Sequence, residues 1–172
     1  MNKIIQGRAW KFGDKIDTDI ITPVDTTTFG LADPEEVRMV VHNAFRPIKP
    51  DFHKMVKKGD ILVAGRNFGF GSHREQANTV LAHLGFSALV AESIARIYFR
   101  NSIAIGFVAF EVPGITKIVQ EGDELQIDMQ QWKLKNLNSG AELHIEPYTE
   151  LVQKILEAGG ILNMLRQRTG AG

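Results

Sequence analysis

Three short apolar segments alternate with two helix-like segments in the middle of the chain, and this order constrains the fold more than any other feature. The apolar segments are 61–65, 87–92 and 107–113, and the helix-like segments between them are 74–84 and 93–106. Short apolar runs are typical of buried strands, whereas apolar residues three or four apart are typical of amphipathic helices. The βαβαβ order predicts a parallel unit of three strands with right-handed crossover helices.

The flanking segments add a second layer and a last helix. Residues 4–13 mix β-branched, aromatic and polar residues and predict a strand, whereas 14–23 are rich in Asp and Thr and predict a structured loop. Residues 24–33 are expected to form an exposed loop. Residues 117–147 alternate apolar and polar side chains, which predicts a small antiparallel β-layer, and 148–168 predict a helix broken by two glycines.

Capping residues suggest where the other helices begin and end. Asp33 is the expected N-cap of a helix over 34–45, with a proline at its first position. Ser93 is the expected N-cap of the helix over 93–106. Gly85 is expected to end the helix before it, because glycine readily adopts the left-handed conformation at a helix end.

The amino-acid composition excludes several classes of partner and several kinds of catalytic group. The 172 residues suit one domain over 1–172, and 20 basic against 20 acidic residues give no net charge to attract nucleic acid or an anionic membrane. The absence of cysteine excludes disulfides, thiolate nucleophiles and cluster ligation by cysteines of this chain. No window approaches the roughly 20 apolar residues of a membrane span, and the first residues lack the apolar stretch of a signal peptide. We therefore expect a cytoplasmic protein.

The stretch NFGFGSHRE, residues 67–75, lies where an expected strand gives way to an expected helix. Ligands of α/β proteins bind at such junctions. Gly69 and Gly71 permit tight backbone geometry and close approach of a ligand. Backbone N–H groups at a helix start attract anions, and the planar guanidinium of Arg74 suits a carboxylate or a phosphate. The stretch predicts an anion site, and a plain glycine-rich turn before a capped helix is the alternative.

Nucleotide and nucleophile motifs do not fit this stretch. No lysine follows the glycines as a P-loop requires, and the third glycine of G-x-G-x-x-G is missing. Ser72 and His73 are adjacent, and neighbours at a helix start do not face each other as a nucleophile and its base must. The other histidines show no metal-ligand spacing, so we expect no metal site in this chain.

Four stretches, in order, resemble the swivelling domain of the aconitase superfamily. GRNFGFGSHREQA is similar to the family signature around a catalytic serine, and DKIDTDIITP is similar to an earlier segment that lines the site. PDFHKMVKKGDILVAG and VAESIARIYFRNSIAIGF resemble two further family segments. The match covers about residues 5–115, and the length of the chain resembles that of the separate small subunits of 3-isopropylmalate dehydratase and its relatives.

This resemblance implies a fold, a partner and a reaction. The fold is the three-layer β/β/α swivelling domain, an α/β architecture. The partner is a large subunit whose cysteines hold a 4Fe–4S cluster, in a heterodimer or heterotetramer, and one cluster iron is the Lewis acid that binds the substrate hydroxyl and carboxylate. The substrate is a small 2-hydroxy di- or tricarboxylate. Dehydration followed by rehydration moves its hydroxyl between neighbouring carbons.

The resemblance also assigns roles to five positions. Ser72 matches the catalytic serine whose alkoxide abstracts a proton from the substrate carbon, a base that needs strong local stabilisation. Arg74 matches the arginine that holds a substrate carboxylate. Thr18 and Asp19 match a pair that lines the site, in which Asp19 orients groups or accepts protons. Thr22 matches a small hydroxyl residue nearby.

Two departures from the family pattern concern the substrate. The family carries a second serine after the catalytic one, and this chain has His73, which we expect to contact a substrate carboxylate or to titrate beside it. Relatives carry a basic and then an aromatic residue in the loop after Pro23, where this chain has VDTTTFG. We expect Thr27 and Thr28 of that loop to contact the substrate.

The expected function is the small subunit of an iron–sulfur hydro-lyase, with 3-isopropylmalate dehydratase of leucine biosynthesis as the first candidate. Homoaconitase and dimethylmalate- or methylmalate-type dehydratases are alternatives of the same class. A module that binds a small anion without catalysis, or that acts only in assembly, is the alternative of another class. The paired Thr18–Asp19 and Ser72–Arg74 argue against a plain anion binder, which needs no base.

Overall fold

A seven-stranded sheet forms the centre of the molecule in the computed structural model, which describes residues 4–26, 33–72 and 74–169. The strand order across the sheet is β4-β3-β2-β1-β5-β6-β7. The strands are β1 (Ile4–Lys11), β2 (Ile61–Ala64), β3 (Ala88–Ala91), β4 (Ala109–Glu111), β5 (Glu124–Asp128), β6 (Lys133–Asn136) and β7 (Glu142–His144).

One half of the sheet is parallel, as the alternation of strands and helices predicts. β2, β3 and β4 pair in parallel, with Leu62 opposite Leu89 and Val90 opposite Phe110. β1 joins them as a fourth parallel strand, with Trp10 opposite Leu62. The expected three-strand unit is therefore correct but incomplete. The pairing of β1 is a long-range contact that local sequence patterns do not encode.

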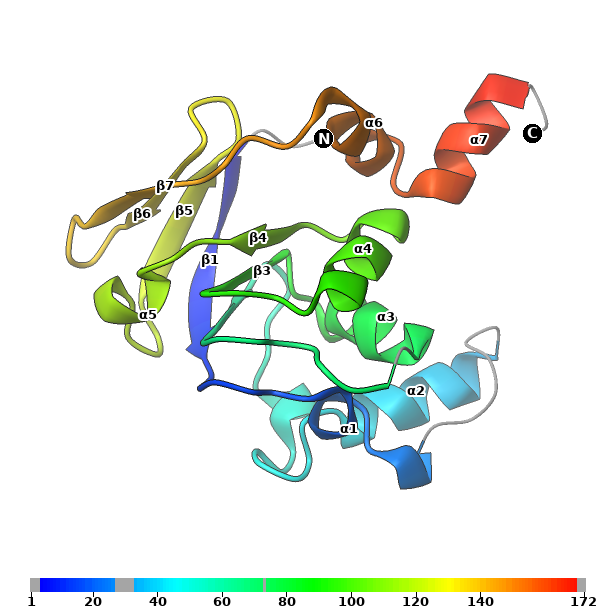
Figure 1. Cartoon of the computed structure of the whole chain (residues 1–172). Coiled ribbons are helices and arrows are strands. Elements are labelled where there is room, and N and C mark those ends of the chain that lie inside the picture. The colour runs from blue at the N-terminus through cyan, green and yellow to red at the C-terminus, as the bar shows by residue number, and fades with distance from the viewer. Residues whose placement is uncertain (1–3, 27–32, 73, 170–172) are drawn as a thin grey trace.

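The other half of the sheet is antiparallel, which confirms the β-layer expected over 117–147. The first residues of β1 pair with β5, with Ile5 opposite Ile127 and Gly7 opposite Leu125, and β6 and β7 follow in order. β1 therefore belongs to both halves and runs between them through the middle of the sheet (Figure 1).

Alternating side chains of the parallel strands enter two separate cores. Leu62 and Leu89 belong to a helix-side core, whereas Ile61 and Val63 belong to a sheet-side core. In the sheet-side core the parallel strands pack against residues of the antiparallel half such as Leu125. The sheet thus curls over the sheet-side core, to which α6 and α7 also contribute, while α2 and α3 cover the helix-side core. This arrangement confirms the β/β/α layers that the resemblance implies.

Helix boundaries follow the capping residues in most places. Asp33 accepts a hydrogen bond from the Glu35 N–H (2.8 Å) at the start of α2, and Gly85, with φ of 103°, ends α3. Gly159 and Gly160 separate α6 from α7, as predicted. Among the described residues, none of the helices combines the length and the hydrophobicity that a membrane-spanning helix requires. The helices are α1 (Thr18–Ile21), η1 (Val24–Thr26), α2 (Pro34–Asn43), η2 (Phe52–Lys54), α3 (Glu75–Leu84), α4 (Arg96–Ala104), α5 (Ile115–Ile118), α6 (Glu150–Glu157) and α7 (Ile161–Thr169).

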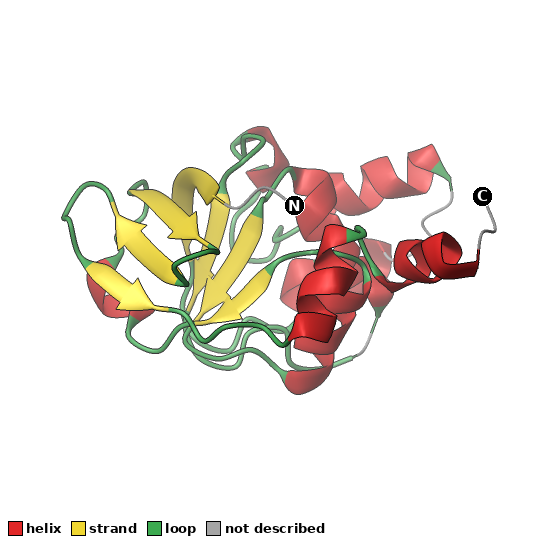
Figure 2. Cartoon of the chain, turned by 90° about the horizontal axis from the view of Figure 1, so that it is seen from above, coloured by secondary structure: helices red, strands yellow, loops and turns green. Residues whose placement is uncertain are grey.

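Four of the helices lie together at one side of the molecule, and one expected cap is wrong. Figures 1 and 2 show α2, α3, α4 and α7 on the side away from β5, β6 and β7. Ser93 does not cap α4, which begins at Arg96 after Ala95. The Ser93 Oγ instead accepts a hydrogen bond from the Asn67 N–H (2.9 Å). This bond ties the start of the glycine-rich loop to the segment before α4.

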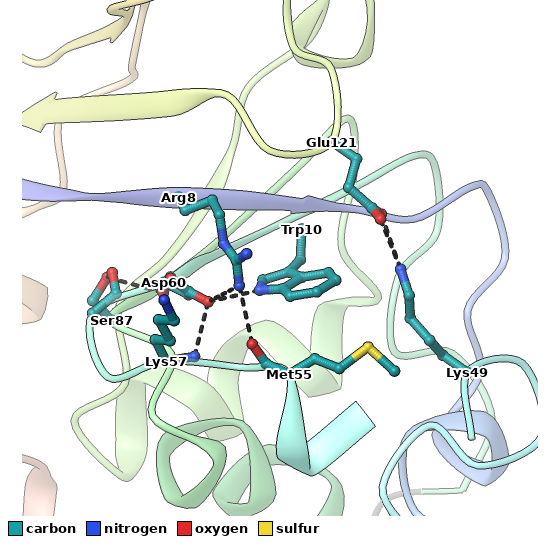
Figure 3. A network of polar contacts seen from close by, with 9 residues as sticks. Arg8, Trp10, Lys49, Met55, Lys57, Asp60, Ser87 and Glu121 are labelled. Atoms are coloured by element: carbon teal, nitrogen blue, oxygen red, sulfur yellow. Dashed lines mark hydrogen bonds and ion pairs between the residues drawn. The ribbon is translucent and has the colours of Figure 1, made fainter. Parts of the chain in front are cut away.

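Asp60 is a buried carboxylate that fixes β1 against the turn before β2 (Figure 3). Its Oδ2 accepts hydrogen bonds from Trp10 Nε1 (2.7 Å), the Lys57 N–H (2.9 Å) and Arg8 Nη2 (3.1 Å). The Arg8 guanidinium also lies 4.4 Å from the centroid of the Trp10 ring. Because three donors meet one buried oxygen, this group stabilises the register of β1 strongly.

We expect Asp60→Asn to lower the free energy of unfolding by about 3 kcal/mol. The neutral amide accepts fewer bonds than a carboxylate and leaves buried donors without partners. Chemical denaturation measures this loss. The control is Glu150→Gln, which removes an exposed ion pair with Lys154 and should leave the free energy of unfolding nearly unchanged. Equal losses in the two variants would contradict the anchoring role.

Candidate active site

The pairing of β1 with β2 continues past the ends of both strands. The Lys15 N–H donates to the Arg66 carbonyl (2.7 Å), and the Thr18 N–H donates to the Phe70 carbonyl (2.9 Å). Parallel strands end at the same edge of a sheet, where α/β proteins bind ligands. The segments that follow β1 and β2 therefore run side by side beyond this edge and bring the two groups of candidate site residues together.

The one-turn helix α1 carries the first group of polar residues. Asp17 caps it, because its Oδ1 accepts a hydrogen bond from the Ile20 N–H (2.7 Å). A structured loop was expected here, and a single turn is too short to give a periodic signal in the sequence. The cap places Thr18 and Asp19 in the first turn, where Thr18 is buried and Asp19 is exposed.

The glycine-rich loop carries the second group and is held by Tyr98. Gly69 has φ of 73°, and a Cβ on it would lie 2.2 Å from the Tyr98 Cγ, so the loop backbone rests directly on this ring. The Tyr98 hydroxyl donates to the Ala77 carbonyl (2.6 Å). Burial raises the pKa of Tyr98 well above its ordinary value, so the hydroxyl stays neutral. Tyr98 thus supports the loop as a neutral side chain.

Ser72 and Thr18 form a pair of hydroxyl groups across the two segments. Their Oγ and Oγ1 atoms lie 3.2 Å apart, within hydrogen-bond distance, and either can be the donor. Ser72 is exposed, whereas Thr18 is 2% exposed. Gly71 permits the approach, since a Cβ on it would lie 3.1 Å from the Thr18 Oγ1. The serine therefore presents its oxygen to solvent with one buried hydroxyl behind it.

Arg74 crosses from the glycine-rich loop to α1. Its Nη2 donates to the Asp19 carboxylate and to the Thr22 carbonyl, the latter at 3.2 Å. The side chain of Arg74 is 23% exposed and that of Asp19 is 59% exposed. Thr22 is buried, and its hydroxyl donates to the Thr18 carbonyl (3.2 Å). The guanidinium is thus oriented by one carboxylate and one carbonyl at the rim of the site.

Five of the residues that the sequence singles out come together in this site. They are Ser72, Arg74, Thr18, Asp19 and Thr22. The other three, His73, Thr27 and Thr28, lie outside the described residues.

Two residues with clear positions in the site were missed by sequence reasoning. Asp17 caps α1, and Tyr98 supports Gly69. The Asp17 cap has a sequence signal, since an Asp that precedes a turn by one residue is a common N-cap. The role of Tyr98 has none, because a tyrosine inside an apolar helix is typical of simple packing.

Within residues 4–26, 33–72 and 74–169 no set of side chains could bind a metal ion or an iron–sulfur cluster. The chain contains no cysteine, and the described residues include no group of three or more His, Asp or Glu side chains that could hold a metal ion. A cluster needs thiolate or imidazole ligands. What the site does offer is a solvent-facing hydroxyl, a supporting hydroxyl and an oriented guanidinium, which suit proton transfer on an anionic substrate.

Comparison with known proteins agrees with this arrangement. Residues 32–114 match the family model described as the aconitase C-terminal domain. A small subunit of isopropylmalate/citramalate isomerase from Methanocaldococcus jannaschii is 43% identical over 168 residues, which cover 98% of this chain and 97% of that protein. A methanogen homoaconitase small subunit from Methanothermobacter thermautotrophicus is 42% identical over 165 residues, which cover 95% of this chain and 91% of that protein.

A solved structure is similar over nearly the whole chain. The crystal structure of 3-isopropylmalate dehydratase from Methanocaldococcus jannaschii superposes with a TM-score of 0.87 at 37% identity, and it covers 96% of this chain and 95% of its own. The fold, the sequence identity and the matched domain all indicate the same family. The chain therefore belongs to the family of small subunits of the 3-isopropylmalate dehydratase and homoaconitase type, within the aconitase superfamily.

Proposed function

We propose that this chain is the small subunit of a hydro-lyase that isomerises a 2-hydroxy dicarboxylate, with Ser72 as the base. The observation that carries this proposal is the contact between the exposed Ser72 Oγ and the buried Thr18 Oγ1, at 3.2 Å. In dehydration, the Ser72 oxygen takes a proton from the carbon next to the one that bears the hydroxyl. The electrons of that C–H bond form the double bond, and the hydroxyl leaves. Hydration on the neighbouring carbon reverses these steps.

The neighbours of Ser72 supply what a serine base requires. A free serine hydroxyl is a weak base, so its deprotonated form must be stabilised where it acts. The Thr18 hydroxyl is buried and within hydrogen-bond distance, and it can donate to the Ser72 oxygen. Thr22 fixes α1 through its bond to the Thr18 carbonyl. We assign Thr18 as the donor that supports the base and Thr22 as a positioning residue.

Arg74 is the proposed contact for a substrate carboxylate. Its guanidinium is planar and binds carboxylates in a fixed orientation. Asp19 and the Thr22 carbonyl hold it at the rim of the site, two residues after Ser72. A carboxylate bound there brings the neighbouring substrate carbon toward the serine. Asp19 orients Arg74 and can exchange protons with the substrate or with solvent.

The remaining chemistry requires a partner. We propose that a large subunit carries the 4Fe–4S cluster, in a heterodimer or heterotetramer, because this chain has no cysteine to bind one. The cluster supplies the Lewis acid for the departing hydroxyl. Both relatives are named as small subunits, which supports a paired enzyme. We further propose that residues 1–172 act as one swivelling domain in the cytoplasm.

The first candidate substrate is isopropylmalate, which would place the enzyme in leucine biosynthesis. The names of the relatives support this choice but also include citramalate and homoaconitase. Dimethylmalate and methylmalate are further candidates of the same class. We propose that His73, Thr27 and Thr28 contact the part of the substrate that differs among these compounds. A panel of these substrates with the assembled enzyme decides between them.

We expect Ser72→Ala to lower kcat of the assembled enzyme by about a thousandfold, since removal of a general base costs roughly two to four orders of magnitude. Steady-state hydration of the unsaturated intermediate measures this change. The control is Ser139→Ala, an exposed serine in the turn after β6, which should leave kcat unchanged. Turnover by Ser72→Ala within twofold of wild type contradicts the assignment.

Arg74→Lys separates binding of the carboxylate from the chemical step. Lysine keeps the positive charge but lacks the planar pair of donors, so we expect KM to rise by about tenfold or more with a smaller change in kcat. Asp19→Asn should give a similar but weaker effect, because it loosens Arg74. Arg38→Lys, on an exposed arginine paired with Glu35, is the control. An unchanged KM in Arg74→Lys rules out the carboxylate contact.

A further inference from the structure

Helix α7 presents an apolar face to solvent. Leu162, Leu165 and Ile161 are 67%, 46% and 38% exposed. Residues three or four apart share one side of a helix, so these three side chains form a continuous strip. Met164, on the side of α7 next to this strip, is 8% exposed and belongs to the sheet-side core, so it anchors the helix. We call the exposed strip the α7 face.

A groove lies beside the α7 face. It has a volume of 340 Å³. Its lining includes Glu75, the residue after Arg74, as well as the first two residues of α7. Its lining residues are Glu75, Asn101, Ala104, Ile105, Ile161 and Leu162.

The start of α7 is held firmly against the end of α4. A Cβ on Gly160 would lie 2.8 Å from the Ala104 carbonyl oxygen, and a Cβ on Gly106 would lie 2.5 Å from the Gly159 carbonyl carbon. Both contacts join backbone to backbone, which only glycine permits. The two walls of the groove are thus fixed relative to each other, and a rigid surface loses less conformational entropy on binding.

Positive charge borders the same surface. Arg96 and Arg100 lie four residues apart on α4, both exposed, and Ile97 beside them is 41% exposed. The ion pairs among the described residues include neither arginine. Exposed apolar side chains next to unneutralised arginines are typical of a protein interface, in which arginine is enriched.

We propose that the α7 face and the groove are the docking surface for the cluster-bearing large subunit. This inference rests on the proposed function. The partner should offer an apolar ridge for the groove and acidic residues opposite Arg96 and Arg100.

The position of the surface favours the large subunit over a second copy of this chain. The partner that completes the site must approach Ser72 and Arg74, which directly precede α3. Figures 1 and 2 show α3, α4 and α7 together on the side of the molecule away from β5, β6 and β7. A large subunit seated over the site therefore also reaches the groove, which Glu75 at the start of α3 helps to line.

The test introduces a charge into the α7 face and measures the affinity for the purified large subunit, reconstituted with its cluster. We expect Leu162→Glu and Leu165→Glu each to weaken this affinity by at least about tenfold, the effect of losing an interface hot spot. Leu137→Glu is the control, since Leu137 is 40% exposed and follows β6 at the other side of the molecule. This variant should bind as wild type. Circular dichroism confirms that each variant is folded.

A fluorescently labelled variant gives a second measurement, which does not require the complex to be weakened. Because the chain has no cysteine, Leu162→Cys and Leu137→Cys can each carry one environment-sensitive fluorophore, attached before mixing. Addition of the large subunit should shift the emission of the label at 162 and leave the label at 137 unchanged. The proposed docking surface is overturned if the emission shifts equally at the two positions, or if the complex forms without a shift at 162.

The outcomes separate this inference from the proposed function. Ser72→Ala should bind the large subunit as wild type while losing turnover. A complex that forms and turns over, but in which Leu162→Glu binds as tightly as wild type, overturns the docking surface alone. A wild-type chain that neither binds the large subunit nor supports turnover overturns both. Sedimentation of the chain alone tests whether a second copy of this chain occupies the surface instead. The proposal is also overturned if the chain forms a dimer that Leu162→Glu dissociates while the affinity for the large subunit stays unchanged.

Discussion

The parallel register between β1 and β2 is the constraint on which the rest of the structure depends. At one end of this pairing, Asp60 accepts a hydrogen bond from Trp10 Nε1. Beyond the other end of both strands, the Thr18 N–H donates to the Phe70 carbonyl. A slip of one residue in this register would turn every β1 side chain to the wrong core and would separate Thr18 from the loop that carries the serine. The same strand also pairs with β5, so the position of the antiparallel half depends on it too.

Local patterns in the sequence predicted most helices and strands correctly. They could not predict which distant segments pair with each other. Asp33 and Gly85 cap their helices as expected, because a cap depends only on residues close by in the sequence. Ser93 fails as a cap because its hydroxyl is occupied by the Asn67 N–H, a contact made across the fold. β1 was expected as a strand, but no local pattern indicates that it joins both halves of the sheet.

The candidate site shows the same division. The glycines and Arg74 predicted an anion site from local chemistry, and the family resemblance alone identified Ser72, Thr18 and Asp19 as partners of that arginine. The structure adds the contacts: a hydroxyl pair, a guanidinium held by two acceptors, and a loop that rests on Tyr98. Thr22 shows the limit of matching by motif, because its hydroxyl is buried and bonded to the Thr18 carbonyl, and its carbonyl, rather than its side chain, holds Arg74.

In the proposed account, one side of the fold both presents the base and receives the cluster-bearing subunit. The central claim is that Ser72 removes the proton from the substrate carbon, and isotope exchange tests it most directly. A substrate deuterated at that carbon is incubated with the assembled enzyme, and loss of deuterium to water is followed by mass spectrometry. With the wild-type enzyme, the rate of deuterium loss should equal or exceed the rate of net turnover. The Ser72→Ala enzyme should bind the substrate, and the substrate should keep its deuterium. Washout by Ser72→Ala at the wild-type rate would contradict the claim.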